Sequence, residues 1–229
     1  MGKDGQPRHR QAARELRRRA AQRQPAERLL IICEGAKTEP LYLREIRQEL
    51  RLPSANVQVQ PAALGTEPLR TVDYAERLFT QGSRALEIHP RSFDRVLAVF
   101  DRDEHHTYNA ALDSAAALNE SMVNDENVKV PFEAVVSVPC FELWLLLHFE
   151  DVLAPLHRDE AVDRLRTHLA GYAKGQGSHW AATRGRVENA MQRVAALTGA
   201  GYTAADGSQP YTNMHELVYR LLHLKDQAA

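Results

Sequence analysis

Three carboxylates of the sequence stand directly after apolar runs. Glu34 follows the run Leu29–Cys33, and Asp101 and Asp103 follow the run at residues 95–100. If these runs are neighbouring parallel strands, their carboxyl ends meet at one edge of a sheet, where open α/β proteins form their sites. Carboxylates brought together repel one another, and a divalent cation relieves this repulsion. Oxygen ligands favour Mg²⁺ or Mn²⁺, which can hold phosphate oxygens and activate water for phosphoryl transfer.

A fourth carboxylate, Glu142, stands just after the apolar run at residues 132–139. It begins a segment, residues 140–149, that is apolar nearly all round and is therefore expected to be a buried helix. A carboxylate beside such a stretch needs a partner, so Glu142 is a candidate fourth metal ligand. The alternative is a helix-start acid that backbone N–H groups satisfy. The Asp-x-Asp spacing likewise has an alternative, because strand ends often carry aspartate as a turn residue or helix cap.

Several nearby residues are candidates for contact with phosphate or for proton transfer. Lys37 lies in a glycine-containing loop before an expected helix, where free backbone N–H groups favour an anion; an exposed loop lysine is the alternative. Arg102, between the two aspartates, is expected to meet phosphate. His105 could carry a proton near neutral pH, or could lie in a solvated loop. Glu39 is interpreted as a first-turn acid matched to the helix dipole.

The segment at residues 171–186, GYAKGQGSHWAATRGR, interleaves basic and aromatic residues with glycines. Such a composition suits a mobile loop over single-stranded or distorted nucleic acid, and it also suits any solvated loop. On the first interpretation, Lys174, Arg184 and Arg186 hold the nucleic acid.

The elements that must position these residues alternate between strand and helix from Leu29 to Phe149. This alternation predicts an α/β fold, a parallel sheet covered on both faces. No convincing strand follows Phe149, so a helical addition is expected there. The expected strands are residues 29–33, 56–61, 95–100 and 132–139. The expected helices are residues 39–50 with Thr38 as cap, 68–79, 107–122, 140–149, 158–170, 183–197 and 214–224.

Charge divides the chain into a basic arm and an acidic body. Residues 1–28 hold nine Lys/Arg against three Asp/Glu, a balance of +6, and since the whole chain carries −1 the remainder carries −7. The arm could bind nucleic acid, or it could be a solvated tail. The expected organisation is an arm at residues 1–28, an α/β domain at residues 29–150 and a helical region at residues 151–229.

Composition points to a cytoplasmic protein that does not associate with membranes. No apolar stretch reaches the roughly 18–20 residues that span a bilayer. The N-terminus lacks the apolar core of a signal peptide, so export is not expected. The two cysteines, Cys33 and Cys140, lie beside apolar runs and are expected to be reduced and buried.

Four segments together resemble the RloB family, bacterial proteins often linked with restriction and phage-defence loci. They are IICEGAKTEPLYL, VLAVFDRDEH, VPCFELWLLLHFE and QPYTNMHELVYRLL, and the resemblance covers residues 29–224. It implies a Toprim-like fold, the metal-binding domain of topoisomerases, primases and some nucleases. By this resemblance Glu34 is a general acid or base, and Asp101 with Asp103 holds Mg²⁺. The chain departs from the family pattern at Val138, where asparagine is expected before Pro139.

Two functions remain open on the sequence. The first is a nuclease dependent on Mg²⁺ or Mn²⁺ that acts on DNA or RNA in defence. Its catalytic residues would be Glu34, Asp101 and Asp103, and Glu142 would join them in holding the metal. The second is a non-catalytic module whose site senses a nucleotide or nucleic acid while a partner protein from a defence operon acts.

Overall fold

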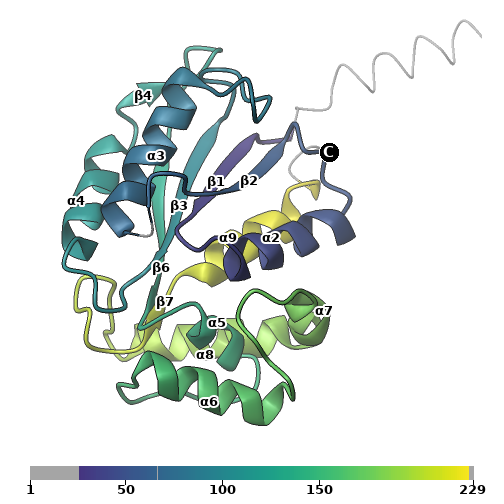
Figure 1. The fold of residues 1–229 in the computed structure, drawn as a ribbon, viewed down its shortest axis with the longest axis vertical. Helices are drawn as coiled ribbons and strands as arrows, with labels where there is room; N and C mark the ends of the chain where they lie inside the picture. The colour runs from purple at the N-terminus through teal and green to yellow at the C-terminus, as the bar shows by residue number, and fades with distance from the viewer. Residues whose placement is uncertain (1–25, 66, 227–229) are drawn as a thin grey trace, which may run out of the picture.

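The structure is a computed structural model that describes residues 26–65 and 67–226. A central sheet carries helices on both faces (Figure 1). Residues 1–25, which make up most of the predicted basic arm, lie outside the described residues. Among the helices that are described, none is both long enough and apolar enough to cross a bilayer.

The sheet is built from five strands in the order β2-β1-β3-β6-β7. The first four pair in parallel, and the last pairs antiparallel with β6. The predicted α/β fold with a parallel-sheet core and C-terminal helices is confirmed. The strands are β1 (Leu29–Cys33), β2 (Val57–Pro61), β3 (Arg95–Asp101), β6 (Phe132–Val138) and β7 (Tyr211–Thr212).

Side chains that alternate along β1 supply two separate cores. Leu30 and Ile32 face α3 (Pro68–Gln81) and α4 (Tyr108–Leu118) on one side of the sheet. Leu29 and Ile31 face the other helices. Because both faces are covered, the strand is apolar throughout rather than alternating, as is typical of buried parallel strands. The helices that contact strands on this side are α2 (Thr38–Glu49), α5 (Glu142–Leu146), α8 (Val187–Gly199) and α9 (Met214–His223). Two further helices pack on these, α6 (Arg158–His168) on α5 and α7 (His179–Thr183) on α2, and a short 3-10 turn at Arg184–Arg186 follows α7.

The C-terminal helices share their core with the sheet. One continuous buried cluster includes residues of β1, α5, α8 and α9. Within it the indole N–H of Trp144 donates to the hydroxyl of Tyr42, with 3.0 Å between the two heavy atoms. The helical region after residue 150 is therefore packed on the second face of the sheet, and its loops can reach the strand ends.

The absence of a strand after Phe149 is a wrong prediction, because β7 adds an antiparallel edge strand. Only two residues pair, which is too short to show a period in the sequence. Asn213 anchors the segment: its side chain accepts from the N–H of Val136 at 2.7 Å and donates to the carbonyl of Ala134 at 2.9 Å. The structure also has a hairpin of two short strands, β4 (Met122–Val123) and β5 (Lys129–Val130), that was not predicted.

Several helix boundaries also differ from those expected. The helix expected over residues 183–197 begins later, because a 3-10 turn occupies Arg184–Arg186 and α8 begins at Val187, and the short helix α7 before this turn was not predicted. Thr38 is the first helical residue of α2 rather than its cap, and its hydroxyl accepts from the N–H of Gly175 at 3.1 Å. That bond links the start of α2 to a distant loop. Both cysteines are free and buried, as predicted.

Candidate metal centre

Adjacent parallel strands bring the first two carboxylates together. β1 and β3 are paired, and beyond the last pair the N–H of Glu34 donates to the carbonyl of Val99 at 2.8 Å. The N–H of Asp101 in turn donates to Oε2 of Glu34 at 3.0 Å. The Glu34 side chain is thus fixed by the backbone of the neighbouring strand.

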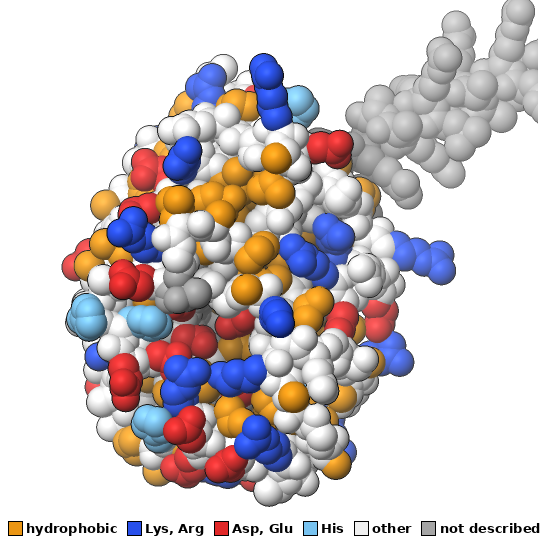
Figure 2. All heavy atoms as spheres, viewed as in Figure 1, with side chains coloured by type: hydrophobic (Ala, Val, Ile, Leu, Met, Phe, Trp, Pro, Cys, Tyr) orange, Lys and Arg blue, Asp and Glu red, His pale blue; other side chains and the backbone are white. Residues whose placement is uncertain are grey.

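A cavity of about 460 Å³ opens at these strand ends. In Figure 2, acidic and basic side chains gather next to one another in the lower half of the face shown. The sequence-predicted carboxylates all line this cavity, which we call the acidic pocket. The acids that line it are Glu34, Glu39, Asp101, Asp103 and Glu142, and the basic residues are Lys37, His105, Arg158 and Lys174.

Glu34 is the carboxylate best suited to exchange a proton near neutral pH. Its side chain is buried, and its pKa is raised to about 7, chiefly by burial and also by Glu39 and Asp103, against the lowering effect of the Asp101 N–H. Oε1 of Glu34 lies 3.0 Å from Nε2 of His105. A buried carboxyl group with a pKa near 7 and an imidazole within hydrogen-bond reach can both accept and donate a proton.

The Asp-x-Asp pair occupies the end of β3 and the loop that follows it. Burial raises the pKa of Asp101 well above its ordinary range, and Glu39, Glu142 and Asp103 raise it further. Asp103 adopts a left-handed backbone conformation with φ of 35°, and its N–H donates to the carbonyl of Pro139 at 2.9 Å. The loop is therefore held against the end of β6 as well as by β3.

Asp103 has one oxygen paired and one free. Oδ2 lies 2.7 Å from Nη1 of Arg158, at the start of α6. Oδ1 is buried, and none of the described residues donates to it. Burial raises the pKa of Asp103, and Arg158 opposes this without cancelling it.

Glu142 is held by a loop from the C-terminal region. Its Oε1 accepts from the hydroxyl of Tyr172 at 2.7 Å and lies 3.1 Å from Nζ of Lys174. Burial raises the pKa of Glu142, but Lys174 and the Tyr172 hydroxyl lower it more, so the net pKa is below its ordinary value. In the structure, Glu142 already has a cationic partner.

This loop crosses the pocket with glycines at both ends. Gly171 and Gly175 have φ of 81° and 77°, a left-handed conformation that L side chains rarely adopt. A Cβ on Gly175 would lie 2.7 Å from Cδ of Lys37, so the close approach also requires glycine. We call residues 171–175 the strap. It lays Tyr172 and Lys174 over the acids.

Glu39 belongs to the acidic pocket, which the sequence analysis did not predict. It is a first-turn acid of α2, as expected. A Cβ on Gly35 would overlap its carboxylate, so the carboxylate turns back over the β1–α2 loop toward the strand ends. Burial raises its pKa, and Glu142 raises it further.

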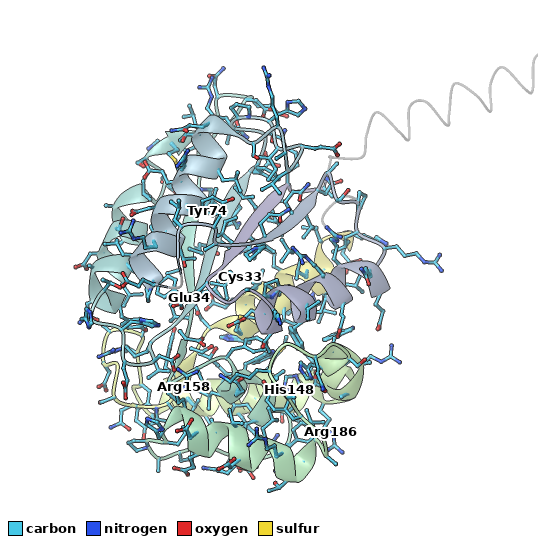
Figure 3. The ribbon with its side chains drawn as sticks, in the orientation of Figure 1. Cys33, Glu34, Tyr74, His148, Arg158 and Arg186 are labelled. Carbon is cyan, nitrogen blue, oxygen red and sulfur yellow. The ribbon has the colours of Figure 1, made fainter. Side chains whose placement is uncertain are left out.

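The candidate nucleic-acid contacts separate into two groups. Lys37 and Lys174 line the acidic pocket, and Arg102 lines an adjoining cavity. Arg184 instead pairs with Glu49 at 2.7 Å, at the far end of α2 from the pocket, and Arg186 stacks over the ring of Phe149 at 5.3 Å. Figure 3 shows Arg186 well away from Glu34, whereas Arg158 lies below Glu34, across the strand ends.

The carboxylate oxygens of the acidic pocket are the type of donor that a hard cation prefers. Within residues 26–65 and 67–226, no three His, Cys, Asp or Glu side chains are arranged to hold a metal ion as they stand. The reason is local: the carboxylates of Glu34, Asp103 and Glu142 face protein groups that carry positive charge or N–H donors. Oδ1 of Asp103 is buried without a hydrogen-bond partner among the described residues, and burial together with neighbouring carboxylates raises the pKa of Asp101. All-oxygen donors suit Mg²⁺ or Mn²⁺.

Comparison with known proteins identifies the family. No curated protein and no solved structure matches the chain. The family model described as RloB-like protein matches residues 29–221, a range that contains the whole sheet and every residue of the acidic pocket. The chain belongs to the RloB-like family.

Proposed function

We propose that this protein is a nuclease dependent on Mg²⁺ or Mn²⁺ that hydrolyses phosphodiester bonds of nucleic acid. The observation that carries the proposal is the convergence of five carboxylates on one pocket that also contains lysine and arginine side chains. Carboxylates alone suit a metal, and cations alone suit a phosphate; a pocket with both suits a metal-bound phosphodiester.

Asp101 and Asp103 would hold the metal, joined by Glu34 and Glu142. A bound Mg²⁺ or Mn²⁺ would supply positive charge to the phosphate oxygens and lower the pKa of a water molecule. Arg158 fixes one oxygen of Asp103 and leaves the other free. The second oxygen is therefore the natural donor.

Glu34 would manage the proton. Oε2 is fixed by the Asp101 N–H, so proton exchange falls to Oε1, which faces His105 at 3.0 Å. With a pKa of about 7, Glu34 can take a proton from the attacking water or give one to the leaving oxygen. Lys37 and Lys174 line the same pocket and would contact the phosphate.

The test is a cleavage assay with labelled single- and double-stranded DNA and RNA, in Mg²⁺, Mn²⁺ or EDTA. Asp101→Asn and Glu34→Gln should each lower the rate, by roughly 10²- to 10⁴-fold for the general acid–base residue. Asp73→Asn, on the exposed side of α3, is the matched control and should cleave like the wild type. Cleavage that persists in EDTA, or survives both variants, would rule the proposal out.

A specific observation favours the non-catalytic alternative as second candidate. Lys174 and Arg158 already neutralise two of the acids, which is the arrangement of a pocket that receives an anion rather than a metal. In that case mononucleotides or oligonucleotides should bind equally well in EDTA, and a partner protein would act. For either function we propose a setting in bacterial defence, which is what the resemblance to the RloB family implies.

A further inference from the structure

A second cavity, of about 180 Å³, adjoins the acidic pocket. Asp103 and Arg158 line both spaces. Their ion pair, with 2.7 Å between Oδ2 and Nη1, therefore lies in the wall that the two spaces share. A ligand in the second cavity would sit immediately beside anything held by the carboxylates.

One wall of this cavity is apolar, and the rest of its lining is polar or charged, with Arg102, Asp103, Glu104, His157, Arg158, Ser208 and Gln209. Val138, Pro139, Leu156 and Pro210 contribute apolar surface. Gln209 contributes a carboxamide that both donates and accepts, and no hydrogen bond joins it to any other described residue. Apolar walls with a few convergent polar groups are the usual lining of a small-molecule site.

Arg102 forms a fixed part of the lining. Its Nη1 donates to the carbonyls of Asp103 at 3.3 Å and His105 at 3.0 Å, and its guanidinium lies 5.4 Å from the ring centre of Tyr108. Residues 207–210 form a loop that is the outer wall of the cavity. Gly207 has φ of 65°, and a Cβ there would lie 3.0 Å from Nε of Arg102, so this loop passes directly over the guanidinium.

The outer wall is anchored on both sides. On the N-terminal side of this loop, the hydroxyl of Tyr108 donates to the carbonyl of Ala204 at 2.9 Å. After it, Tyr211 pairs with Val138, and Ser137 bonds Thr212 through their hydroxyls at 3.0 Å. A cavity with walls held in this way is largely preformed, so little ordering is required when a ligand binds.

We propose that this cavity binds the base of the nucleotide whose phosphate lies in the acidic pocket. The inference rests on the proposed function in taking the acidic pocket as the phosphate site. Sites for drug-sized ligands measure about 300–1,000 Å³, so a 180 Å³ cavity accommodates one ring system and not a base pair. The substrate at this position is therefore an unpaired nucleotide, with its ring against apolar walls and its edge at Gln209.

The probes for the test are the four nucleoside 5′-monophosphates and ribose 5-phosphate, titrated calorimetrically into the full chain with Ca²⁺ present. Burial of the base against the apolar wall predicts that the monophosphates bind about 10- to 150-fold more tightly than ribose 5-phosphate. Leu156→Trp fills the cavity and should abolish this difference while leaving ribose 5-phosphate binding unchanged. Leu153→Trp, at an exposed leucine outside the cavity, is the matched control and should keep the difference.

Gln209→Ala changes a loop residue outside the two hydrophobic cores, so the variant is expected to fold. It should reduce the differences in affinity among the four bases and leave ribose 5-phosphate unaffected. Equal binding of ribose 5-phosphate and all monophosphates by the wild type would overturn the inference, as would a preference that Leu156→Trp and Gln209→Ala both retain. Binding is measured separately from cleavage, so the two proposals can fail independently. A base-dependent affinity without cleavage would refute the proposed nuclease activity and support the base site. Cleavage without a base-dependent affinity would refute the base site and support the nuclease activity.

Discussion

Replacing Glu34 with glutamine removes the ionisable group at the centre of the acidic pocket while keeping its shape. The residue is 7% exposed, and the pKa rises from 4.5 to about 7 because burial disfavours the charged form, with Glu39 and Asp103 adding to the effect. The amide can still accept the hydrogen bond from the N–H of Asp101 that now reaches Oε2 at 3.0 Å. The variant therefore tests the ionisation of Glu34 rather than its packing.

The sign and size of the expected change in the free energy of unfolding follow from the linkage between protonation and folding. A carboxyl group with a raised pKa in the folded state contributes stability that is complete below the unfolded pKa of 4.5 and is lost as the pH rises through 7. At 1.36 kcal/mol for each pKa unit, an increase from 4.5 to about 7 corresponds to about 3 kcal/mol. The free energy of unfolding of Glu34→Gln, relative to the wild type, should therefore increase by about 3 kcal/mol between pH 4.5 and pH 8.

The assay is urea unfolding of both proteins in EDTA at several pH values from 4.5 to 8. Other titrating groups are common to both proteins, so the difference between them isolates Glu34. Glu188→Gln, an exposed glutamate in the first turn of α8, controls for the loss of one negative charge. A difference between Glu34→Gln and the wild type that stays constant with pH would refute the reasoning, because it would show that Glu34 ionises as freely in the folded as in the unfolded chain.

Three further predictions concern metal, charge pairing and acid stability. Mn²⁺ should raise the melting temperature of the wild type, since it binds only the folded site, and should not raise that of an Asp101→Asn/Asp103→Asn double variant; equal shifts would place the ion elsewhere. Lys174→Met should lower the urea-unfolding free energy at pH 7 by about 1–3 kcal/mol, because the buried Glu142 loses the cation that pairs with it, whereas the exposed Lys129→Met should not. Burial lowers the pKa of His148 to about 4, so stability should fall by up to about 3 kcal/mol from pH 6.5 to pH 4, and His148→Gln should remove most of that fall on urea unfolding.

The meeting of the carboxylates at one edge of the sheet could be predicted because it depends only on which strands are neighbours. Glu34 and Asp101 follow buried apolar runs, and buried parallel strands present their carboxyl ends at a common edge. The pairing of β1 with β3 is all that the prediction needed, and the structure has it. Glu142 follows β6, the next strand in the sheet, for the same reason.

The residues that the sequence analysis missed reach the pocket through side-chain direction or tertiary packing. Glu39 was interpreted only as a dipole-matched acid, and whether its carboxylate turns outward or back over Gly35 is not encoded in helical spacing. Arg158 begins a helix in a region with no strand pattern, and it meets Asp103 only because α6 packs against α5, the helix that follows β6. No local signal distinguishes it from any other first-turn arginine.

The segment at residues 171–186 shows that composition alone does not predict which side chains reach the pocket. Its composition predicted one nucleic-acid loop, yet the structure divides it. Lys174, in the strap, lies over Glu142, whereas Arg184 and Arg186 face Glu49 and Phe149. The positive-φ glycines at 171 and 175 end the strap, and α7 then carries the chain away from the pocket. Composition identified the segment, but only the turn geometry determines which of its cations reach the acids.

The pattern of charge pairing in the acidic pocket indicates where positive charge is missing. Glu142 has a fixed cation in Lys174, and its pKa is lowered. Glu34, Glu39 and Asp101 have no lysine or arginine at ion-pair distance among the described residues, and burial raises the pKa of each, as it does for Asp103 despite Arg158. Two of these three stand at the ends of β1 and β3, and the third turns toward them from α2. A divalent cation bound there would stabilise the ionised forms of several carboxylates at once without displacing Lys174. On the proposed function, such an ion would lie at the strand ends, beside the oxygen of Asp103 that has no hydrogen-bond partner among the described residues.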